Sequence, residues 1–388
     1  MLKRTIVVLA ILITLPYARG PVYDFPDPAP FAGEAFYNPY EGLLGQWQRA
    51  NFHAHGRAWG GFTSGRQPSE AVARAYRSIG YSVPGVSNYH HIAALDGVPT
   101  IPLYEHGYNI GKHHQIAIGA RRVDWFDFPL WQSLSHQQFV IDRVGQTADL
   151  VALAHPPSRD AYSEDDLRWL TDYQLLEVVN GPHRSEVPWD AALSSGHAVW
   201  ALANDDSHDL NDPRRTAMAW NMLDAPSAAN ADIVDALRAG RAYAVMRTNS
   251  TASAIETVLH DVQFAGGTLR ITCTGEPSTF SFVGQNGVVR HAVPNAMSAE
   301  YSFGADDTYI RAVIQSPRTT MYLNPVFRYD GVHLPAPSSA VNATTTWLMR
   351  GSVVLVAVAA AAAYRRRQRL VLGSLDRPVL PDANQSTA

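Results

Sequence analysis

The stretch Asn51-Phe52-His53-Ala54-His55 carries two histidines two residues apart. Successive side chains of a β-strand point to opposite faces, so an extended backbone here would turn both imidazoles to the same side. Outward from this stretch, from about Gln46 to Arg247, short apolar runs alternate with helical patterns. That alternation is typical of βα units. We therefore expect an α/β fold.

The expected elements follow from local signals. Ser163 stands three residues before Asp166 in a capping-box pattern, and Gly80 and Gly240 stand where helices end. Helices are expected at 68–78, 163–170 and 231–239. Strands are expected at 81–87, 115–119, 150–154, 175–179 and 199–203.

Further acids and histidines stand at the ends of these strands. The carboxyl ends of parallel strands in a barrel meet at one rim, and imidazoles with carboxylates suit Zn²⁺, Mn²⁺ or Fe²⁺. Clustering supports this interpretation, because only three of the 15 histidines lie beyond Arg247. The expected metal ligands are His53, His55, Glu105, His114, His155, Asp206 and His208.

These residues resemble, in order, the motifs of the PHP (polymerase and histidinol phosphatase) family of metal-dependent phosphoesterases. The matching motifs are Phe52-His53-Ala54-His55, Pro102-Leu103-Tyr104-Glu105, His114-Gln115-Ile116, Ala154-His155-Pro156 and Asp206-Ser207-His208. The resemblance implies a distorted (β/α)7 TIM-like barrel over residues 46–249.

The resemblance also implies two metal ions with Glu105 as a shared ligand. His53, His55, Glu105 and Asp206 would surround one ion, and Glu105, His114 and His155 the other. His113 is the alternative to His114, which abuts the expected strand at 115–119.

Two departures concern a third metal. The family has an Asp where this chain has Gly60, and Asp-His where it has Asn88-Tyr89. A third site, which would also use His208, is therefore lost or rebuilt with His90.

The resemblance implies hydrolysis of a phosphate ester by a metal-activated water. The expected catalytic residues are His208, as acid for the leaving oxygen, with Arg57 and Asp206. Expected substrate contacts are Arg57, Lys112 and Asn204; Asn204, Glu177 and Asn180 could alternatively support the metal ligands. The substrate would be a phosphorylated small molecule or an envelope component.

Two other functions fit the same residues. Metal-dependent hydrolases of C–N or C–O bonds use similar histidines and aspartates at barrel rims. A non-catalytic binding module that retains a metal is the second alternative, favoured by Gly60 and Tyr89. Nucleic acid is not expected as a partner, because the net charge is −4 without a dominant basic patch.

The sequence pattern changes after residue 249. Short β-type runs separated by Gly, Asp, Asn and Pro predict a small all-β sandwich over residues 250–338. The expected strands are 269–273, 279–283, 300–303, 309–314 and 320–323. Cys273 is the only cysteine, which excludes an intrachain disulfide and a thiolate zinc site.

The two ends predict membrane attachment. Residues 1–20, with Lys3 and Arg4 before an apolar run, fit an export signal or N-terminal anchor, followed by a lead-in at 21–45. Residues 345–364 are apolar over a length suited to a bilayer, and Arg365-Arg366-Arg367 follow. The positive-inside rule then makes 365–388 a cytoplasmic tail and places the catalytic domain on the extracytoplasmic side of the cell membrane.

Overall fold

The computed structural model describes residues 5, 13–63, 65–95, 97, 100–248 and 256–375, with side chains described up to residue 367. One compact unit comprises Tyr23–Ala340. A second unit is formed by the two ends, up to Val22 and from Val341. Lys3 and Arg4, the expected boundary at 249/250 and the end of the expected tail lie outside the described residues.

Strands and helices alternate through the first part of the large unit. The strands are β1 (Tyr23–Asp24), β2 (Ala35–Tyr37), β3 (Trp47–Asn51), β4 (Val83–Pro84), β5 (Leu103–His106), β6 (Gln115–Ile118), β7 (Leu150–Leu153), β8 (Leu175–Asn180), β9 (His183–Arg184), β10 (Trp200–Asn204), β11 (Ala219–Asp224) and β12 (Ala242–Arg247). The helices are α2 (Ser69–Ser78), α3 (Leu134–Gly145), α4 (Glu164–Trp169), α5 (Glu186–Ser194) and α6 (Asn230–Arg238), with 3₁₀ turns η1 (Trp59–Gly61) and η2 (Ser158–Asp160).

Local chemistry explains these elements. Every residue of β7, β8 and β10 is buried, as expected for apolar strands covered on both faces. The capping box predicted for α4 is formed, since the Ser163 hydroxyl accepts from the Asp166 N–H and the Asp166 side chain accepts in return. The mixed α/β character predicted from the sequence is confirmed.

Strand pairings close an irregular ring around the centre of this part. β10, β8 and β7 are parallel neighbours, and β3 is parallel to β4. The single parallel bridges Ala54–Ser207 and Tyr89–Glu105 join β3 to β10 and β4 to β5. β6 runs antiparallel to both β5 and β7, so the ring is not all-parallel, and the pairings do not show the distorted (β/α)7 TIM-like barrel implied by the resemblance. The reason is the short link from β5 to β6, because a parallel crossover needs a dozen or more residues.

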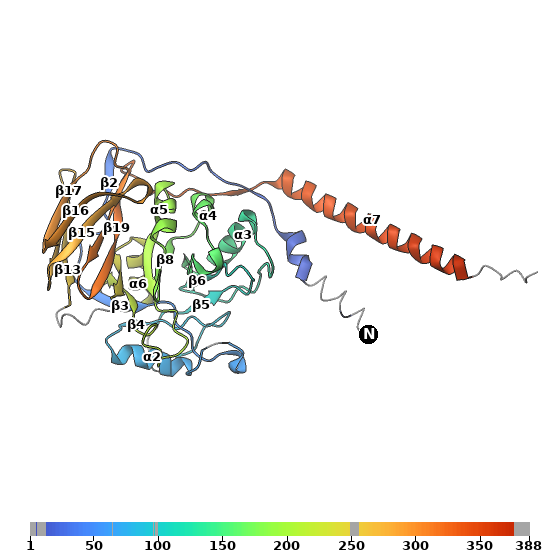
Figure 1. Ribbon diagram of the computed structural model, residues 1–388, viewed down its shortest axis with the longest axis horizontal. Helices are drawn as coiled ribbons and strands as arrows, with labels where there is room; N and C mark the ends of the chain where they lie inside the picture. The colour runs from blue at the N-terminus through green and yellow to red at the C-terminus, as the bar shows by residue number, and fades with distance from the viewer. Residues whose placement is uncertain are drawn as a thin grey trace, which may run out of the picture. The chain divides into compact units, whose positions relative to one another are not determined.

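Antiparallel strands dominate the rest of the large unit. They are β13 (Val258–Ala265), β14 (Thr268–Thr274), β15 (Ser278–Gly284), β16 (Val288–Ala296), β17 (Ser298–Ser302), β18 (Tyr309–Gln315) and β19 (Thr319–Tyr329), with η3 (Gln285–Gly287) between β15 and β16. The short strand β20 (Ala340–Val341) follows at the end of this unit. In Figure 1 the sheets built from β13 to β19 lie on one side of this unit, and α3 and α4 lie on the other.

Two sheets form this β-rich part and share one core. β13, β14 and β17 make a three-stranded sheet, and its Ile271 and Cys273 belong to the same buried cluster as Phe280 and Ile314 of the larger sheet. The larger sheet has nine strands and continues into the first part of the chain, because β12 pairs with β19. This sheet therefore contains strands from both sides of the domain boundary predicted at 249/250.

The second unit contains helix α7, Ala343–Leu375. Its segment Ala343–Arg367 is long and apolar enough to cross a membrane, by length and composition, and it contains the span predicted at 345–364.

Candidate metal centre

Backbone pairing brings two of the predicted motifs together at one end of the strand ring. Asp206 N donates to His53 O at 2.8 Å, and His55 N donates to Ser207 O at 2.8 Å. These are the hydrogen bonds of a short parallel ladder between the residues after β3 and those after β10. His53, His55 and Asp206 thereby share one side of the ladder.

Four ligand atoms meet at this point: His53 Nε2, His55 Nε2, Glu105 Oε2 and Asp206 Oδ1. The two histidine nitrogens are 3.2 Å apart. Each nitrogen lies 3.1–3.4 Å from the Glu105 oxygen and 3.3 Å from the Asp206 oxygen. Zinc bonds of about 2.0–2.1 Å put neighbouring ligands of a tetrahedron about 3.3–3.4 Å apart. The distances around the two histidine nitrogens therefore fit neighbouring ligands of one tetrahedral ion.

The two carboxylate oxygens support the same conclusion. Glu105 Oε2 and Asp206 Oδ1 are buried and accept no hydrogen bond from any described residue. A buried carboxylate oxygen without a partner is costly, because it loses its hydration without replacement. A divalent cation between them would remove that cost.

Glu177, on β8, fixes the orientation of His53. Its Oε1 accepts from His53 Nδ1 at 2.8 Å and from Asn204 Nδ2 at 2.8 Å. Its Oε2 accepts from the His155 backbone N–H at 2.8 Å and from Asn180 Nδ2 at 2.9 Å. With the proton held on Nδ1, the Nε2 atom of His53 is free to bind a metal, which is the usual arrangement of a carboxylate, a histidine and a metal.

A second group of ligands surrounds the other oxygen of Glu105. Oε1 accepts from His114 Nδ1, and His155 Nε2 lies 3.2 Å away. His53, Glu105 and His155 also form a group able to hold an ion. His113 instead lies 3.3 Å from Asn109 through its Nδ1, so His114 is the member of the pair that reaches Glu105.

His155 and Asp206 adopt left-handed backbone conformations, with φ of 34° and 48°. Such values are uncommon for residues other than glycine and often mark functional positions. The adjacent Asp205 stabilises the turn, because its carboxylate accepts from the N–H groups of Ala217, Met218 and Ala219 and from the Tyr76 hydroxyl. Burial raises the pKa of Asp205 to about 6.

The charges of the centre depend on one another. Burial lowers the pKa of His53, but Asp206, Glu177 and Glu105 raise it more, so that it stands well above its ordinary value. Burial raises the pKa of Glu105, but His114 and His53 hold it well below its ordinary value. The metal-free centre is thus a cluster of carboxylates that retains a proton on histidine, and a cation would displace that proton.

Both ring nitrogens of His90, the residue expected to rebuild a third site, have backbone partners. His90 Nδ1 faces the Asp124 carbonyl at 3.1 Å, and its Nε2 accepts from the Gly107 N–H at 3.0 Å. Asn88 also has backbone and side-chain partners, since it accepts from Gly56 N and donates to the Ser69 hydroxyl. Tyr89 instead stacks on His55 at 4.8 Å between ring centroids.

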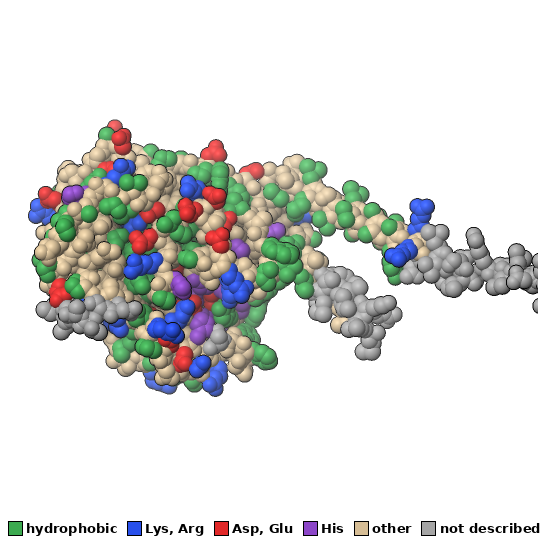
Figure 2. Space-filling view, in the orientation of Figure 1, with side chains coloured by type: hydrophobic (Ala, Val, Ile, Leu, Met, Phe, Trp, Pro, Cys, Tyr) green, Lys and Arg blue, Asp and Glu red, His purple; other side chains and the backbone are tan. Residues whose placement is uncertain are grey.

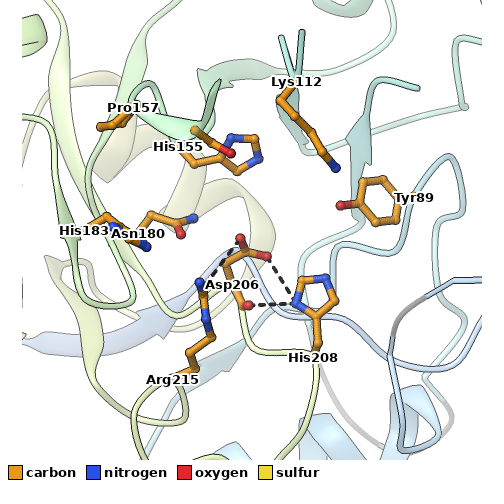
Figure 3. Close-up of a pocket in the computed structure, with 10 residues that line it drawn as sticks. Tyr89, Lys112, His155, Pro157, Asn180, His183, Asp206, His208 and Arg215 are labelled. Carbon is orange, nitrogen blue, oxygen red and sulfur yellow. Dashed lines mark hydrogen bonds and ion pairs between the residues drawn. The ribbon is translucent and has the colours of Figure 1, made fainter. Parts of the chain in front are cut away.

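A pocket of about 370 Å³ opens beside the ligands. Its lining residues are Tyr89, Lys112, His155, Pro157, Ser158, Asn180, His183, Asp206, His208 and Arg215. The Lys112 ammonium and the Tyr89 hydroxyl point into it, and Arg215 reaches toward Asp206 (Figure 3). On the surface, histidine and basic side chains gather on one face of the molecule (Figure 2).

Lys112 and Arg215 make this pocket cationic. Arg215 Nη1 lies 3.8 Å from Asp206 Oδ2. Lys112 is partly buried, 6.0 Å from the Tyr89 ring centroid, and pairs with no carboxylate among the described residues. An unpaired ammonium beside a pocket favours an anionic ligand.

The structure places two predicted substrate contacts elsewhere. Arg57 does not line the pocket, and its Nη2 donates to the Arg66 carbonyl at 2.7 Å. Asn204 is fully buried and holds Glu177, while its Oδ1 accepts from Phe52 N. Both corrections have one cause: a position near a strand end does not determine where a side chain points.

Sequence reasoning missed Arg215 and His183 in the pocket. Arg215 belongs to the segment between β10 and β11, where Asp212-Pro213-Arg214-Arg215 looks like an ordinary charged turn. His183 follows β8 and shows no spacing to another ligand. Neither residue carried a signal that distinguishes it from surface charge.

The chain was compared with family models, with curated proteins and with solved structures. No family model matches the chain. No curated protein matches it either. A solved structure that is similar is described as a two-domain protein containing a predicted PHP-like metal-dependent phosphoesterase from Bacteroides vulgatus ATCC 8482. The identity is 13%, the match covers 82% of this chain and 99% of that one, and the TM-score is 0.38.

Proposed function

We propose that this chain is a metal-dependent phosphoesterase. The observation that carries the proposal is a buried pair of histidine nitrogens 3.2 Å apart, each 3.1–3.4 Å from Glu105 Oε2 and from Asp206 Oδ1. Neither carboxylate oxygen has a hydrogen-bond partner among the described residues. The cationic pocket beside them adds the preference for an anionic substrate. Together these features match a hydrolytic metal centre that faces a phosphate group.

His53, His55, Glu105 and Asp206 would hold one ion, and Glu105, His114 and His155 a second. Bound divalent ions supply charge neutralisation and activation of water in such sites. Zn²⁺, Mn²⁺ and Fe²⁺ all suit this ligand set.

The pocket residues have separate tasks in this proposal. Lys112 and Arg215 attract the phosphate and orient its oxygens. Burial and the nearby Glu105 raise the pKa of Tyr89, so its phenol keeps its proton and can donate a hydrogen bond to the substrate.

His208 takes a different part from the one expected for it. Its Nδ1 lies 2.9 Å from the Asp206 carbonyl, which favours a proton on Nδ1 and leaves Nε2 able to accept one. Burial, followed by the nearby His55, lowers the pKa of His208. We therefore assign His208 the role of accepting a proton from the attacking water, in place of protonating the leaving group.

The place of action is also a proposal. Helix α7 supplies a segment able to cross a membrane, and three arginines end that segment. The positive-inside rule favours an extracytoplasmic catalytic unit, with a phosphorylated small molecule or an envelope component as substrate.

The test uses the full-length chain purified in detergent. We expect metal to co-purify or to bind on addition of Zn²⁺ or Mn²⁺, and a generic aryl phosphate to be hydrolysed. His53→Ala and Glu105→Ala should abolish both properties. The exposed residues His333 and Glu300 provide matched controls, since their alanine variants should leave both intact.

Two outcomes would contradict the proposal. A protein that binds no metal and hydrolyses no phosphoester would leave a binding module. A metal-loaded protein that cleaves an amide or a carbon–oxygen ester, but no phosphoester, would favour the other hydrolase class.

A further inference from the structure

Three exposed aromatic side chains stand next to the metal pocket. Trp59, Tyr108 and Trp125 are 46%, 51% and 57% exposed, and we call them the aromatic shelf. Large aromatic surfaces are usually buried, where their area stabilises a fold most. Three exposed rings beside a candidate active site therefore suggest contact with a ligand.

The shelf is held in place by specific contacts. The indole Nε1 of Trp59 donates to the Tyr89 carbonyl at 2.8 Å. The Trp125 ring meets the Trp59 ring edge to face at 5.6 Å and stacks on His90 at 5.3 Å. The Tyr108 hydroxyl donates to the Trp125 carbonyl at 3.3 Å. The exposed faces are thus positioned before a ligand arrives, which reduces the entropy lost on binding.

The backbone at Trp59 is strained in the same place. Its φ is 52°, in the left-handed region that bulky residues rarely adopt, and Gly60 and Gly61 follow with φ of 64° and 93°. Strained residues cluster at ligand-binding positions. In this backbone conformation the indole of Trp59 remains exposed to solvent.

Two loops connect the shelf to residues that line the metal pocket, although the shelf residues themselves do not line it. Tyr89, whose carbonyl holds Trp59, stacks on the ligand His55 and lines the pocket. Tyr108 lies in the same loop as Lys112, whose ammonium points into that pocket. One small molecule can therefore place its phosphate at the metal centre and its remaining part on the shelf.

We propose that the shelf binds the alcohol part of the phosphoester substrate, and that this part carries a ring with an apolar face. This inference rests on the proposed phosphoesterase function. The shelf side chains are uncharged and offer no cationic partner for a phosphate, so we assign the ring of the substrate to the shelf and its phosphate to the metal pocket. Stacking on aromatic side chains tolerates different rings, and both a sugar ring and a flat aromatic ring present a suitable face.

The experiment compares primary alkyl phosphates that differ in the ring. The probes are ethyl phosphate, phenethyl phosphate and a hexose phosphorylated at its primary hydroxyl, assayed with the metal-loaded full-length chain. The quantity measured is the ratio of kcat/KM for each ring substrate to kcat/KM for ethyl phosphate. The two ring substrates distinguish an aromatic ring from a sugar ring.

Trp59→Ala and Trp125→Ala should lower this ratio by about 5- to 150-fold, mainly through KM, as loss of one stacking partner does elsewhere. Trp59→Phe should keep most of the ratio, because it retains a ring while it loses the hydrogen bond to Tyr89. Trp131 is 74% exposed and has no ring contact with the shelf among the described residues. Trp131→Ala is the matched control and should keep the wild-type ratio.

Results that overturn the inference are distinct from those that overturn the function. If wild type hydrolyses all three phosphates with the same kcat/KM, or if both alanine variants keep the wild-type ratio, the shelf does not bind the substrate. A variant that loses activity equally on all three probes acts through Tyr89 and the metal centre. Absence of hydrolysis of every probe would instead contradict the phosphoesterase itself.

Discussion

Glu177 offers the sharpest test of the metal centre, through the variant Glu177→Gln. The carboxylate is fully buried and accepts four N–H groups, two on each oxygen. Glutamine keeps one oxygen and replaces the other with an NH₂ donor. In either orientation of the amide, its NH₂ group faces two N–H groups that donated hydrogen bonds to the carboxylate.

The magnitude follows from these contacts. If the NH₂ group faces the His155 backbone and Asn180, two hydrogen bonds are lost, at about 1 kcal/mol each. If it faces His53, the imidazole must shift its proton to Nε2, the atom that would bind the metal. Loss of such a support typically weakens metal binding about 10- to 100-fold, which is about 1.4–2.8 kcal/mol.

The assay is competition for Zn²⁺ with a chromophoric chelator at a fixed pH. Glu164→Gln, at an exposed glutamate of α4, is the control and should bind Zn²⁺ as wild type does. Circular dichroism would verify that both variants fold. Unchanged Zn²⁺ affinity in a folded Glu177→Gln variant would refute the reasoning, because His53 would then not need its carboxylate partner.

Four further predictions concern the same region. Because the pKa of His53 is raised in the metal-free centre, Zn²⁺ affinity should increase with pH until the pH exceeds that raised pKa. For the same reason, the stability that protonated His53 gives the metal-free protein should be complete below about pH 6.5 and should be lost as the pH rises through the raised pKa. Denaturation of the metal-free protein at several pH values would check this. Lys112→Ala should raise KM for an aryl phosphate about tenfold, whereas Arg74→Ala, at an exposed position of α2, should not. Calorimetric titration with Zn²⁺ should resolve a tight and a weaker site, since His114 must first leave its hydrogen bond to Glu105; a single equal class of sites would contradict this. Asp205→Asn should lower the free energy of unfolding by about 2–3 kcal/mol in urea denaturation, because an amide cannot accept all four hydrogen bonds of Asp205.

The sequence allowed the elements and most candidate ligands to be predicted. β7 ends two residues before His155, and β10 ends directly before Asp205-Asp206. Each strand contains a short apolar run, so the strand and the position of the polar group that follows it could be predicted from neighbouring residues. Helix α4 could also be predicted from the sequence, because its capping box involves residues only three apart. The closeness of His53, His55, Glu105 and Asp206 followed from the expectation that strand ends converge.

The directions of side chains and of strands could not be predicted from neighbouring residues in the sequence. His90 and Arg57 carry groups suited to a metal and a phosphate, yet backbone carbonyls accept their hydrogen bonds, from Asp124 of another loop and from Arg66 of the same loop. Arg215 enters the pocket from a turn that resembles a surface loop. The antiparallel course of β6 places His114, at its beginning, beside Glu105, which a purely parallel arrangement would not do.

Features that depend on neighbours along the chain could be predicted from the residues alone: the apolar periodicity, the helix caps, the order of histidines and carboxylates, and the apolar helix at 343–367. Three other features became visible only in the folded chain: the pairing of β12 with β19 in one sheet, the support of His53 by Glu177, and the contact of Trp59 with Trp125 in the shelf. These features differ in the distance along the chain between the residues involved. Hydrogen bonds and ring contacts between residues far apart in sequence depend on how the whole core packs, and no local pattern records that packing.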